Sequence, residues 1–179
     1  MQRLAFDIVN THFQNSSTEK ESLCLLLIGV AGTGKRYLVN ALKGLFQCRC
    51  IITATTGTDA YNIKGQTVHS VLKLPIGSHH KCDLKGISLH RLQESMNGID
   101  YIFIDEYSLL GQQTFGWIDR RCKQITGIHN KPLGDKSLIL IGDPAQLPPV
   151  ADKPLYHTKP TNEIGEQACA SHRSKIGAI

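Results

Sequence analysis

A glycine-rich segment that ends in a lysine carries the clearest chemistry in this sequence. Two glycines stand five positions apart, at 29 and 34, and Lys35 follows the second of them. Glycines let the backbone turn several N–H groups toward one point, and the N-terminus of a following helix adds partial positive charge there. This spacing is that of the phosphate-binding P-loop, in which the lysine neutralises the outer phosphates of a nucleotide. The predicted nucleotide-binding residues of this segment are Gly29, Ala31, Gly32, Thr33, Gly34, Lys35 and Arg36.

One position departs from the P-loop pattern. The pattern places Ser or Thr directly after the lysine, where the hydroxyl holds a magnesium ion, and this chain has Arg36 there. A guanidinium contacts phosphate well but cannot ligate a cation. Arg36 therefore weakens the case for catalysis more than the case for phosphate binding.

Two adjacent acids, Asp105 and Glu106, form the second chemical motif. They directly follow the apolar run 101–104, and ligands of doubly wound sheets lie beyond the carboxyl ends of the strands, so both acids should face the P-loop. Asp105 is the candidate magnesium ligand, and Glu106 the candidate base for the attacking water. Gln146 follows the next apolar run, and its amide is expected to sense a terminal phosphate. The predicted catalytic residues are Lys35, Asp105, Glu106 and Gln146.

Short apolar runs and periodic segments supply the elements that position these residues. Continuous apolar runs predict buried parallel strands at residues 23–28, 49–54, 101–104 and 137–141. Apolar residues at helical spacing predict helices over 2–13, 37–43, 89–96 and 112–125. Together they predict an α/β domain with a mostly parallel central sheet flanked by helices. This domain is expected to span residues 1–160, followed by an irregular tail at 161–179.

Two segments between these elements lack a regular pattern. Residues 55–70 are rich in glycine and hydroxyl groups and predict a loop whose donors suit the phosphates of a nucleic acid; a solvated connector is the other interpretation. Residues 75–90 predict a loop or insertion. On the helix at 112–125, Trp117 is expected to pack in the core, while Arg120, Arg121 and Lys123 are expected to form a solvated basic face.

Composition places the chain among ordinary globular proteins. It has 179 residues, of which 41% are hydrophobic and 20% charged, enough for one domain with a proper core. A net charge of +5 gives a mild bias toward polyanionic partners. The N-terminal segment carries an acid early, and no run approaches the roughly 20 apolar residues of a membrane span. Neither a signal peptide nor a membrane anchor is therefore expected.

The six cysteines predict a reducing compartment. They are scattered without a C-x-x-C pair, and Cys24 lies in a predicted strand, where a buried free thiol is expected. His79, His80 and Cys82 are close together, but a second half-site with zinc-ligand spacing is missing. Zinc is therefore disfavoured there.

Taken together, these motifs resemble the first RecA-like motor domain of a superfamily 1 helicase, and most closely the Pif1-like group. The resemblance spans residues 2 to about 156. Residues 29–36 resemble motif I, 105–108 motif II, and 142–150 motif III nearly in full, the last being the most family-specific. The region from 56–57 through 67–70 resembles the single-strand-contacting motif Ia and its extension. Through these motifs the resemblance implies DNA contacts at Thr56, Gly57 and His69, and an adenine-reading role for Gln2.

The resemblance also implies an activity. Members of this group are expected to unwind DNA in the 5′-to-3′ direction by hydrolysing ATP with magnesium, acting in DNA repair and recombination. The implied partners are single-stranded DNA or DNA junctions, with no membrane. The implied state is a monomer inside the cell, in the nucleus or mitochondrion if the source is eukaryotic.

Several features keep other interpretations open. Nothing after residue 160 resembles a second motor domain, so a helicase would be incomplete in this chain. Thr55 stands where the family usually has proline, and Asp59 puts a negative charge near the expected DNA path. Arg36 and the lack of a second motor domain support an alternative. In it, the chain is a non-catalytic module that binds nucleotide or single-stranded DNA and has lost turnover. An unrelated P-loop ATPase is disfavoured by the motif III segment.

Overall fold

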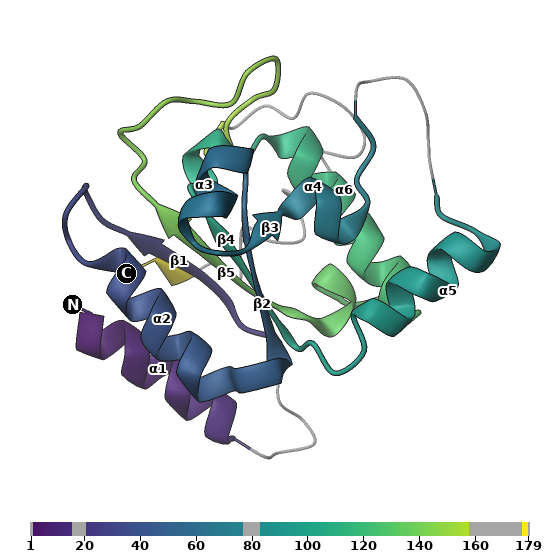
Figure 1. The fold of residues 1–179 in the computed structure, drawn as a ribbon, viewed down its shortest axis with the longest axis horizontal. Coiled ribbons are helices and arrows are strands. Elements are labelled where there is room, and N and C mark those ends of the chain that lie inside the picture. Colours follow the sequence, from purple (N-terminus) through teal and green to yellow (C-terminus); the bar gives the residue numbers. More distant parts are fainter. Residues whose placement is uncertain (1, 16–20, 77–82, 158–176, 179) are drawn as a thin grey trace.

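A single parallel sheet runs through the centre of the computed structural model, which describes residues 2–15, 21–76, 83–157 and 177–178 (Figure 1). Its spatial order is β3-β2-β4-β5-β1-β6, and every pairing is parallel. The strands are β1 (Cys24–Ile28), β2 (Cys50–Ala54), β3 (Gln66–Thr67), β4 (Tyr101–Asp105), β5 (Ser137–Gly142) and β6 (Gly177–Ala178). The four predicted strands are confirmed. The sequence did not predict β3 or β6, each of two residues.

Helices connect the strands and cover both faces of the sheet. The α-helices are α1 (Gln2–Gln14), α2 (Lys35–Phe46), α3 (Gly57–Asn62), α4 (Val68–Leu72), α5 (Gly86–Ser95) and α6 (Gln112–Thr126). Three 3-10 turns are η1 (Gln47–Arg49), η2 (Tyr107–Leu109) and η3 (Pro132–Asp135). The four predicted helices are confirmed, with α5 starting three residues earlier than expected.

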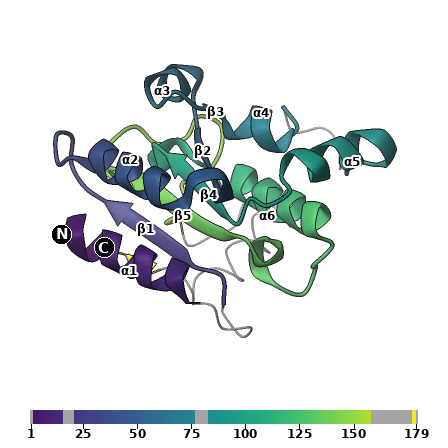
Figure 2. The ribbon, with the colours of Figure 1, turned by 60° about the horizontal axis from the view of Figure 1, so that its bottom comes forward.

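The alternation of side chains along each strand divides the core into two layers. In β4, Tyr101 and Phe103 pack with α1 and α2, whereas Ile102 and Ile104 pack with α4, α5 and α6. In Figure 2, α1 and α2 lie on the left, and α4, α5 and α6 on the right. The strands β1, β2, β4 and β5 thus contribute apolar residues to both layers, which explains the continuous apolar runs in the sequence.

The predicted loop at 55–70 is wrong. The segment forms α3, β3 and α4, and two threonines explain why. The Thr56 side chain accepts a hydrogen bond from the N–H of Asp59, and that of Thr67 accepts one from the N–H of Ser70. These hydroxyls act as N-caps, which start helices instead of leaving the chain irregular.

The predicted basic face on α6 is also wrong for Arg121, which is only 1% exposed. Its guanidinium donates to the carbonyl of Leu72 at 3.1 Å and to that of Lys73 at 3.0 Å. These carbonyls lie at the C-terminal end of α4, so Arg121 ties α6 to α4. Trp117 is buried, as expected.

Three remaining expectations concern thiols, metals and membranes. Cys24 is a buried free thiol, and burial raises its pKa to about 11. His79, His80 and Cys82 fall outside the described residues. Among the helices that the structure describes, none is long and apolar enough to cross a membrane.

Candidate nucleotide site

The P-loop joins the carboxyl end of β1 to the first turn of α2. The N–H of Gly29 donates to the carbonyl of Gly142 at 3.1 Å, which fixes the start of the loop to the end of β5. Gly32 and Gly34 have φ angles of 82° and 80°, in the left-handed region that glycine adopts without a steric penalty. Ala31, Gly32 and Thr33 are exposed. The loop therefore has the conformation for which its glycines were predicted.

Lys35 is the first residue of α2 and folds back over the loop. Its Nζ donates to the carbonyl of Gly29 at 2.6 Å and to that of Val30 at 3.1 Å. The cation is thus held where the loop and the N-terminus of α2 meet, which is the position that phosphate binding requires.

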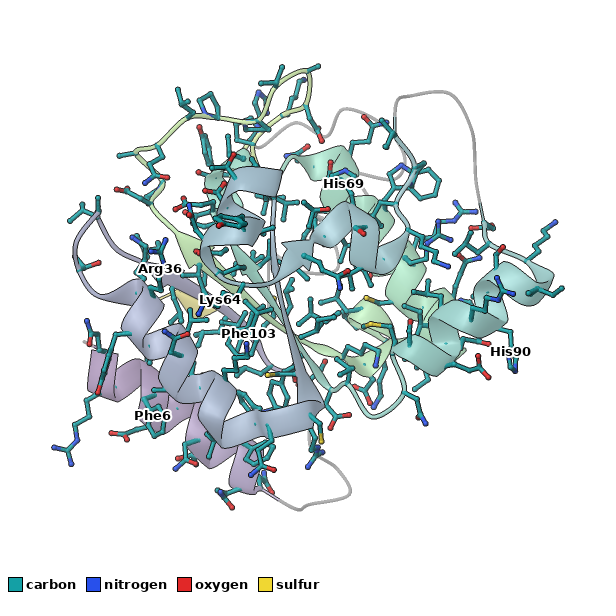
Figure 3. The ribbon with its side chains drawn as sticks, viewed as in Figure 1. Phe6, Arg36, Lys64, His69, His90 and Phe103 are labelled. Atoms are coloured by element: carbon teal, nitrogen blue, oxygen red, sulfur yellow. The ribbon has the colours of Figure 1, made fainter. Side chains whose placement is uncertain are left out.

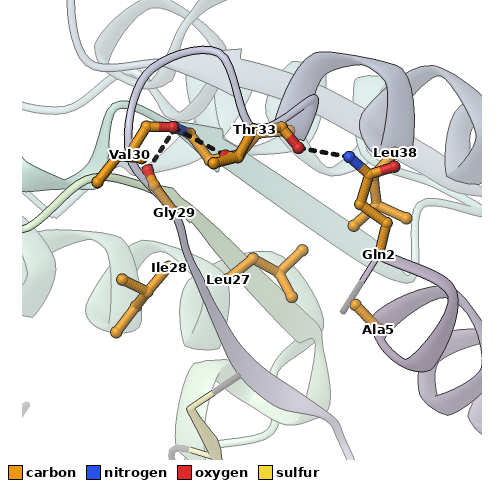
Figure 4. Close-up of a pocket in the computed structure, with 9 residues that line it drawn as sticks. Gln2, Ala5, Leu27, Ile28, Gly29, Val30, Thr33 and Leu38 are labelled. Carbon is orange, nitrogen blue, oxygen red and sulfur yellow. Dashed lines mark hydrogen bonds between the residues drawn. The ribbon is translucent and has the colours of Figure 1, made fainter.

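Gln2 lies beside the P-loop although it is distant in sequence. Its side-chain amide donates to the carbonyl of Thr33, and Figure 4 shows it beside the loop. It helps to line a cavity of about 280 Å³, and a Cβ on Gly34 would come within 2.3 Å of its Nε2. The cavity is lined by Gln2, Ala5, Leu27, Ile28, Gly29, Val30, Thr33, Lys35 and Leu38. The structure therefore brings the predicted Gln2 and P-loop residues together.

Asp105 lies at the carboxyl end of β4, on the same side of the sheet as α2. It is in register with Ala54 of β2 and Ile141 of β5, and it has the same parity as Phe103, which packs against α2. Burial raises the pKa of the Asp105 carboxyl, while the N–H of Glu106 and the charges of Arg36 and Lys35 lower it. Asp105 thus shares its environment with both cations of the P-loop.

Glu106 is held in an unusual position next to Asp105. Its φ of 54° is in the left-handed region, and its Oε2 is buried with no hydrogen-bond partner among the described residues. Burial and the charges of Asp105 and Asp59 raise the pKa of its carboxyl. A poorly solvated carboxylate with a raised pKa is suited to accept a proton from water.

Gln146 and Glu106 line the same cavity. It measures about 690 Å³ and is lined by Asp59, Glu106, Ser108, Leu109, Ala145, Gln146, Leu147 and Pro148. Gln146 is exposed, and its N–H donates to the carbonyl of Asp143 at 3.2 Å. The loops after β2, β4 and β5 therefore meet at this cavity.

Asp143 is a buried acid that we did not predict as a site residue. It is 7% exposed at the carboxyl end of β5, its carboxylate accepts the N–H of Ala145 at 2.9 Å, and its charge raises the pKa of Glu106. The available signal was its place after an apolar strand, which is also the place of Asp105.

The three candidate DNA contacts follow neighbouring strands. Thr56 and Gly57 come after β2, and His69 comes after β3. The last residues of these two strands, Ala54 and Thr67, are paired in register, so both segments begin at the same edge of the sheet. Gly57 is exposed, whereas Thr56 and His69 are half-buried, and burial lowers the pKa of His69. The Thr56 hydroxyl also donates to the carboxylate of Asp59. The three residues therefore share one edge of the sheet, and Asp59 is engaged by the cap of α3.

The residues present fit a magnesium ion poorly. Asp105 is available as a carboxylate, but the next expected oxygen ligand is replaced by the guanidinium of Arg36, which cannot coordinate a cation. Within the described residues, no group of three or more His, Cys, Asp and Glu side chains is arranged to hold a metal. The nucleotide elements are thus present without the usual donor set for the ion.

Comparison with known proteins decides the family. A model described as PIF1-like helicase matches residues 2–169. The chain belongs to the PIF1-like helicase family. It is 34% identical over 138 residues to the ATP-dependent DNA helicase PIF1 of Saccharomyces cerevisiae (strain YJM789), covering 73% of this chain and 16% of that protein. It is 30% identical over 128 residues to the Homo sapiens PIF1, covering 70% of this chain and 20% of that protein.

Solved structures of Pif1 helicases share the fold. Bacteroides sp Pif1 in complex with ADP-AlF4 matches with a TM-score of 0.68 and 26% identity, over 83% of this chain and 33% of that one. Bacteroides Pif1 in complex with ADP-AlF3 and ssDNA matches with a TM-score of 0.69 and 27% identity, over 83% of this chain and 34% of that one. These matches confirm the predicted RecA-like α/β fold. The chain spans about a third of each of these structures.

Proposed function

We propose that this chain is the nucleotide-binding part of a PIF1-type ATP-dependent DNA helicase, in which ATP hydrolysis drives 5′-to-3′ movement on single-stranded DNA. The observation that carries the proposal is the placement at the carboxyl edge of one parallel sheet of Lys35, whose charge acts on Glu106, and of the cavity that Glu106 shares with Gln146. ATP is the nucleotide because the related helicases are named ATP-dependent, and one related structure holds ADP-AlF4.

Each residue has a role in this proposal. The N–H groups of the P-loop and the Lys35 ammonium bind the phosphates, and the cavity beside Gln2 receives the base of the nucleotide. Glu106 accepts the proton of the water whose oxygen attacks the terminal phosphorus, and ADP leaves as the bond to its oxygen breaks. Gln146 contacts the terminal phosphate from the separate cavity that it shares with Glu106. Magnesium supplies charge neutralisation in such enzymes, and Asp105 is its remaining candidate ligand here.

Single-stranded DNA is the proposed partner, with DNA junctions as a further substrate. Thr56, Gly57 and His69 offer polar groups on one edge of the sheet, and the net charge of +5 favours a polyanion. A related Pif1 structure is described in complex with ssDNA, which supports this choice. We further propose that the protein is a monomer that works inside the cell, in the nucleus or mitochondrion of a eukaryote, in DNA repair and recombination.

DNA-stimulated ATP hydrolysis tests the proposal. The chain extended by a second motor domain should hydrolyse ATP faster with single-stranded DNA than without it. Glu106→Gln should lower that rate by a factor of about 10² to 10⁴, the contribution of a general base, while nucleotide binding persists. Glu94→Gln on α5 is the matched control, since its side chain is 66% exposed and far from the cavity in the fold. Absence of any DNA stimulation in the extended protein would contradict the proposal.

Arg36 supports a second candidate function, a nucleotide-binding or DNA-binding module without turnover. If hydrolysis appears in the extended protein only after Arg36→Ser, the native chain is a binder. If Arg36→Ser leaves an already active protein unchanged or less active, this second candidate is excluded.

A further inference from the structure

Arg36 stands at the point where the family pattern requires an oxygen ligand, and its surroundings suggest what it does instead. It is the second residue of α2, it is exposed, and Figure 3 shows it at the end of α2 that the P-loop enters. Within the described residues, no ion pair of 4.0 Å or less and no side-chain hydrogen bond engages it. Its five N–H donors are thus available to a ligand.

Asp105, the candidate magnesium ligand, lies on the same side of the sheet as α2, the helix that carries Arg36. The parity of β4 directs Asp105 toward the face of the sheet that α2 covers, as it does Phe103. Arg36, in the first turn of α2, and Asp105, at the end of β4, therefore both lie at the carboxyl edge of the sheet on the face that α2 covers.

Neighbouring hydroxyls do not restore the missing ligand. The Thr33 hydroxyl donates to the carbonyl of Val30 at 2.8 Å, and the Thr55 hydroxyl donates to the carbonyl of Glu106 at 3.1 Å. The Thr33 hydroxyl is thus engaged within its own loop, and the Thr55 hydroxyl is engaged by the segment that follows β4. A divalent ion at this point would also meet the positive guanidinium, whose repulsion water screens only partly beside a half-buried carboxylate.

We propose that Arg36 takes the place of magnesium in nucleotide binding, so that this chain binds nucleoside di- and triphosphates without a divalent cation. The guanidinium bonds the phosphate oxygens and at the same time neutralises Asp105. Arginine suits this task because its planar fork donates two parallel hydrogen bonds to phosphate and is always charged. The inference rests on the proposed nucleotide site, which it deepens.

Equilibrium binding of a fluorescent ADP or ATP analogue to the 179-residue chain tests this inference, once with excess EDTA and once with millimolar MgCl₂. In the native chain the two dissociation constants should agree within about threefold, because the guanidinium is present in both conditions. Arg36→Ser should bind at least about tenfold more weakly in EDTA, the loss of one charge-assisted contact, and magnesium should recover most of that loss.

Two further variants distinguish the charge and the planar shape of the Arg36 guanidinium from the effect of losing any surface arginine. Arg36→Lys keeps the charge without the fork and should lie between the native chain and Arg36→Ser in EDTA. Arg91→Ser, an exposed arginine on α5, should bind like the native chain in both conditions. Circular dichroism confirms that each variant is folded.

The possible results distinguish this inference from the proposed function. If the native chain binds nucleotide about tenfold or more tightly with magnesium than with EDTA, the substitution of the ion by Arg36 is wrong while the nucleotide site stands. If the folded native chain binds no nucleotide in either condition, both the inference and the proposed nucleotide site are overturned.

Discussion

Glu106 carries an ionisable carboxylate into a position that water reaches poorly. Burial and the charges of Asp105 and Asp59 raise its pKa above the ordinary value of 4.5, and a left-handed backbone holds it there. Such positions cost stability and persist where a function needs them. The lysine of the P-loop partly offsets this cost by lowering the same pKa.

The pH dependence of stability follows from that shift. A carboxyl whose pKa is higher in the folded than in the unfolded chain binds its proton more tightly when folded, so stability falls as pH rises from below 4.5 through the raised folded pKa. Glu106→Gln removes the ionisable carboxyl and therefore this loss of stability at high pH. At pH 7 the variant should have a higher Tm than the native chain, and the gain should shrink at pH 4.

Thermal unfolding at pH 4, 5.5 and 7 measures this effect. The exposed Glu94→Gln serves as the control and should leave Tm within about 1 °C of the native chain at each pH. A Glu106→Gln variant that melts below the native chain at pH 7 would show that the carboxylate stabilises the fold.

At the scale of elements, α6 packs with α4 and α5 on one face of the sheet. Arg121 connects it to α4 through two carbonyls, and Asp152 caps its N-terminal end by accepting the N–H groups of Gln113 and Thr114. Both contacts come from residues far apart in sequence. The position of α6 therefore depends on charged groups that the apolar stripe of the helix does not reveal.

Arg121→Ala should be strongly destabilising. It leaves the carbonyls of Leu72 and Lys73 without the donors that the guanidinium supplied, and it opens a cavity at a side chain only 1% exposed. We expect a loss of about 3 kcal/mol in the free energy of unfolding, measured by urea denaturation. Arg120→Ala, which removes a partly exposed ion pair with Asp83, should cost less than about 1 kcal/mol. Equal losses in the two variants would contradict the role of Arg121.

Asp152→Ala should weaken the N-terminal end of α6. The carboxylate accepts N–H groups of the first turn at 3.1–3.2 Å, and loss of such a cap typically costs about 1–2 kcal/mol. Hydrogen exchange should accelerate at Gln113 and Thr114 first. Asp7→Ala, at an exposed acid on α1, should leave stability within about 0.5 kcal/mol of the native chain.

At the scale of the whole molecule, the parallel sheet brings all loops that follow strands to one edge. The P-loop, the acids after β4, the Gln146 loop and the caps of α3 and α4 gather there for this reason. The candidate nucleotide residues and the candidate DNA contacts thus lie at the same edge of one sheet.

Salt should weaken DNA binding if that edge contacts the phosphates of a single strand. For a single strand, the logarithm of the binding constant falls with the logarithm of the salt concentration with a slope near −0.7 per phosphate contact. With about three such contacts, the affinity for oligo-dT should drop roughly tenfold to twentyfold between 50 and 200 mM salt. Fluorescence anisotropy measures this slope. An affinity independent of salt would exclude backbone contacts as the basis of binding.

Local patterns in the sequence were sufficient for much of this protein. The apolar runs of β1, β2, β4 and β5 predicted buried parallel strands because a strand covered on both faces must be apolar throughout. The glycines predicted the turn between β1 and α2, where Gly32 and Gly34 have positive φ angles, because backbone conformation is a local property. The position of Asp105 at the carboxyl edge followed from its place at the end of the apolar run that forms β4.

Only the tertiary structure decided the rest. The two-residue strands β3 and β6 have no pattern of their own, and α3 and α4 are too short to be set by propensity without the packing of Ala60, Val68 and Leu72. Arg121 can be buried because its guanidinium donates to two carbonyls at the end of α4. The residues next to Arg121 in the sequence do not indicate these partners. The cavity shared by Glu106 and Gln146 arises where separate loops meet, since distances across a sheet are set by strand order and register.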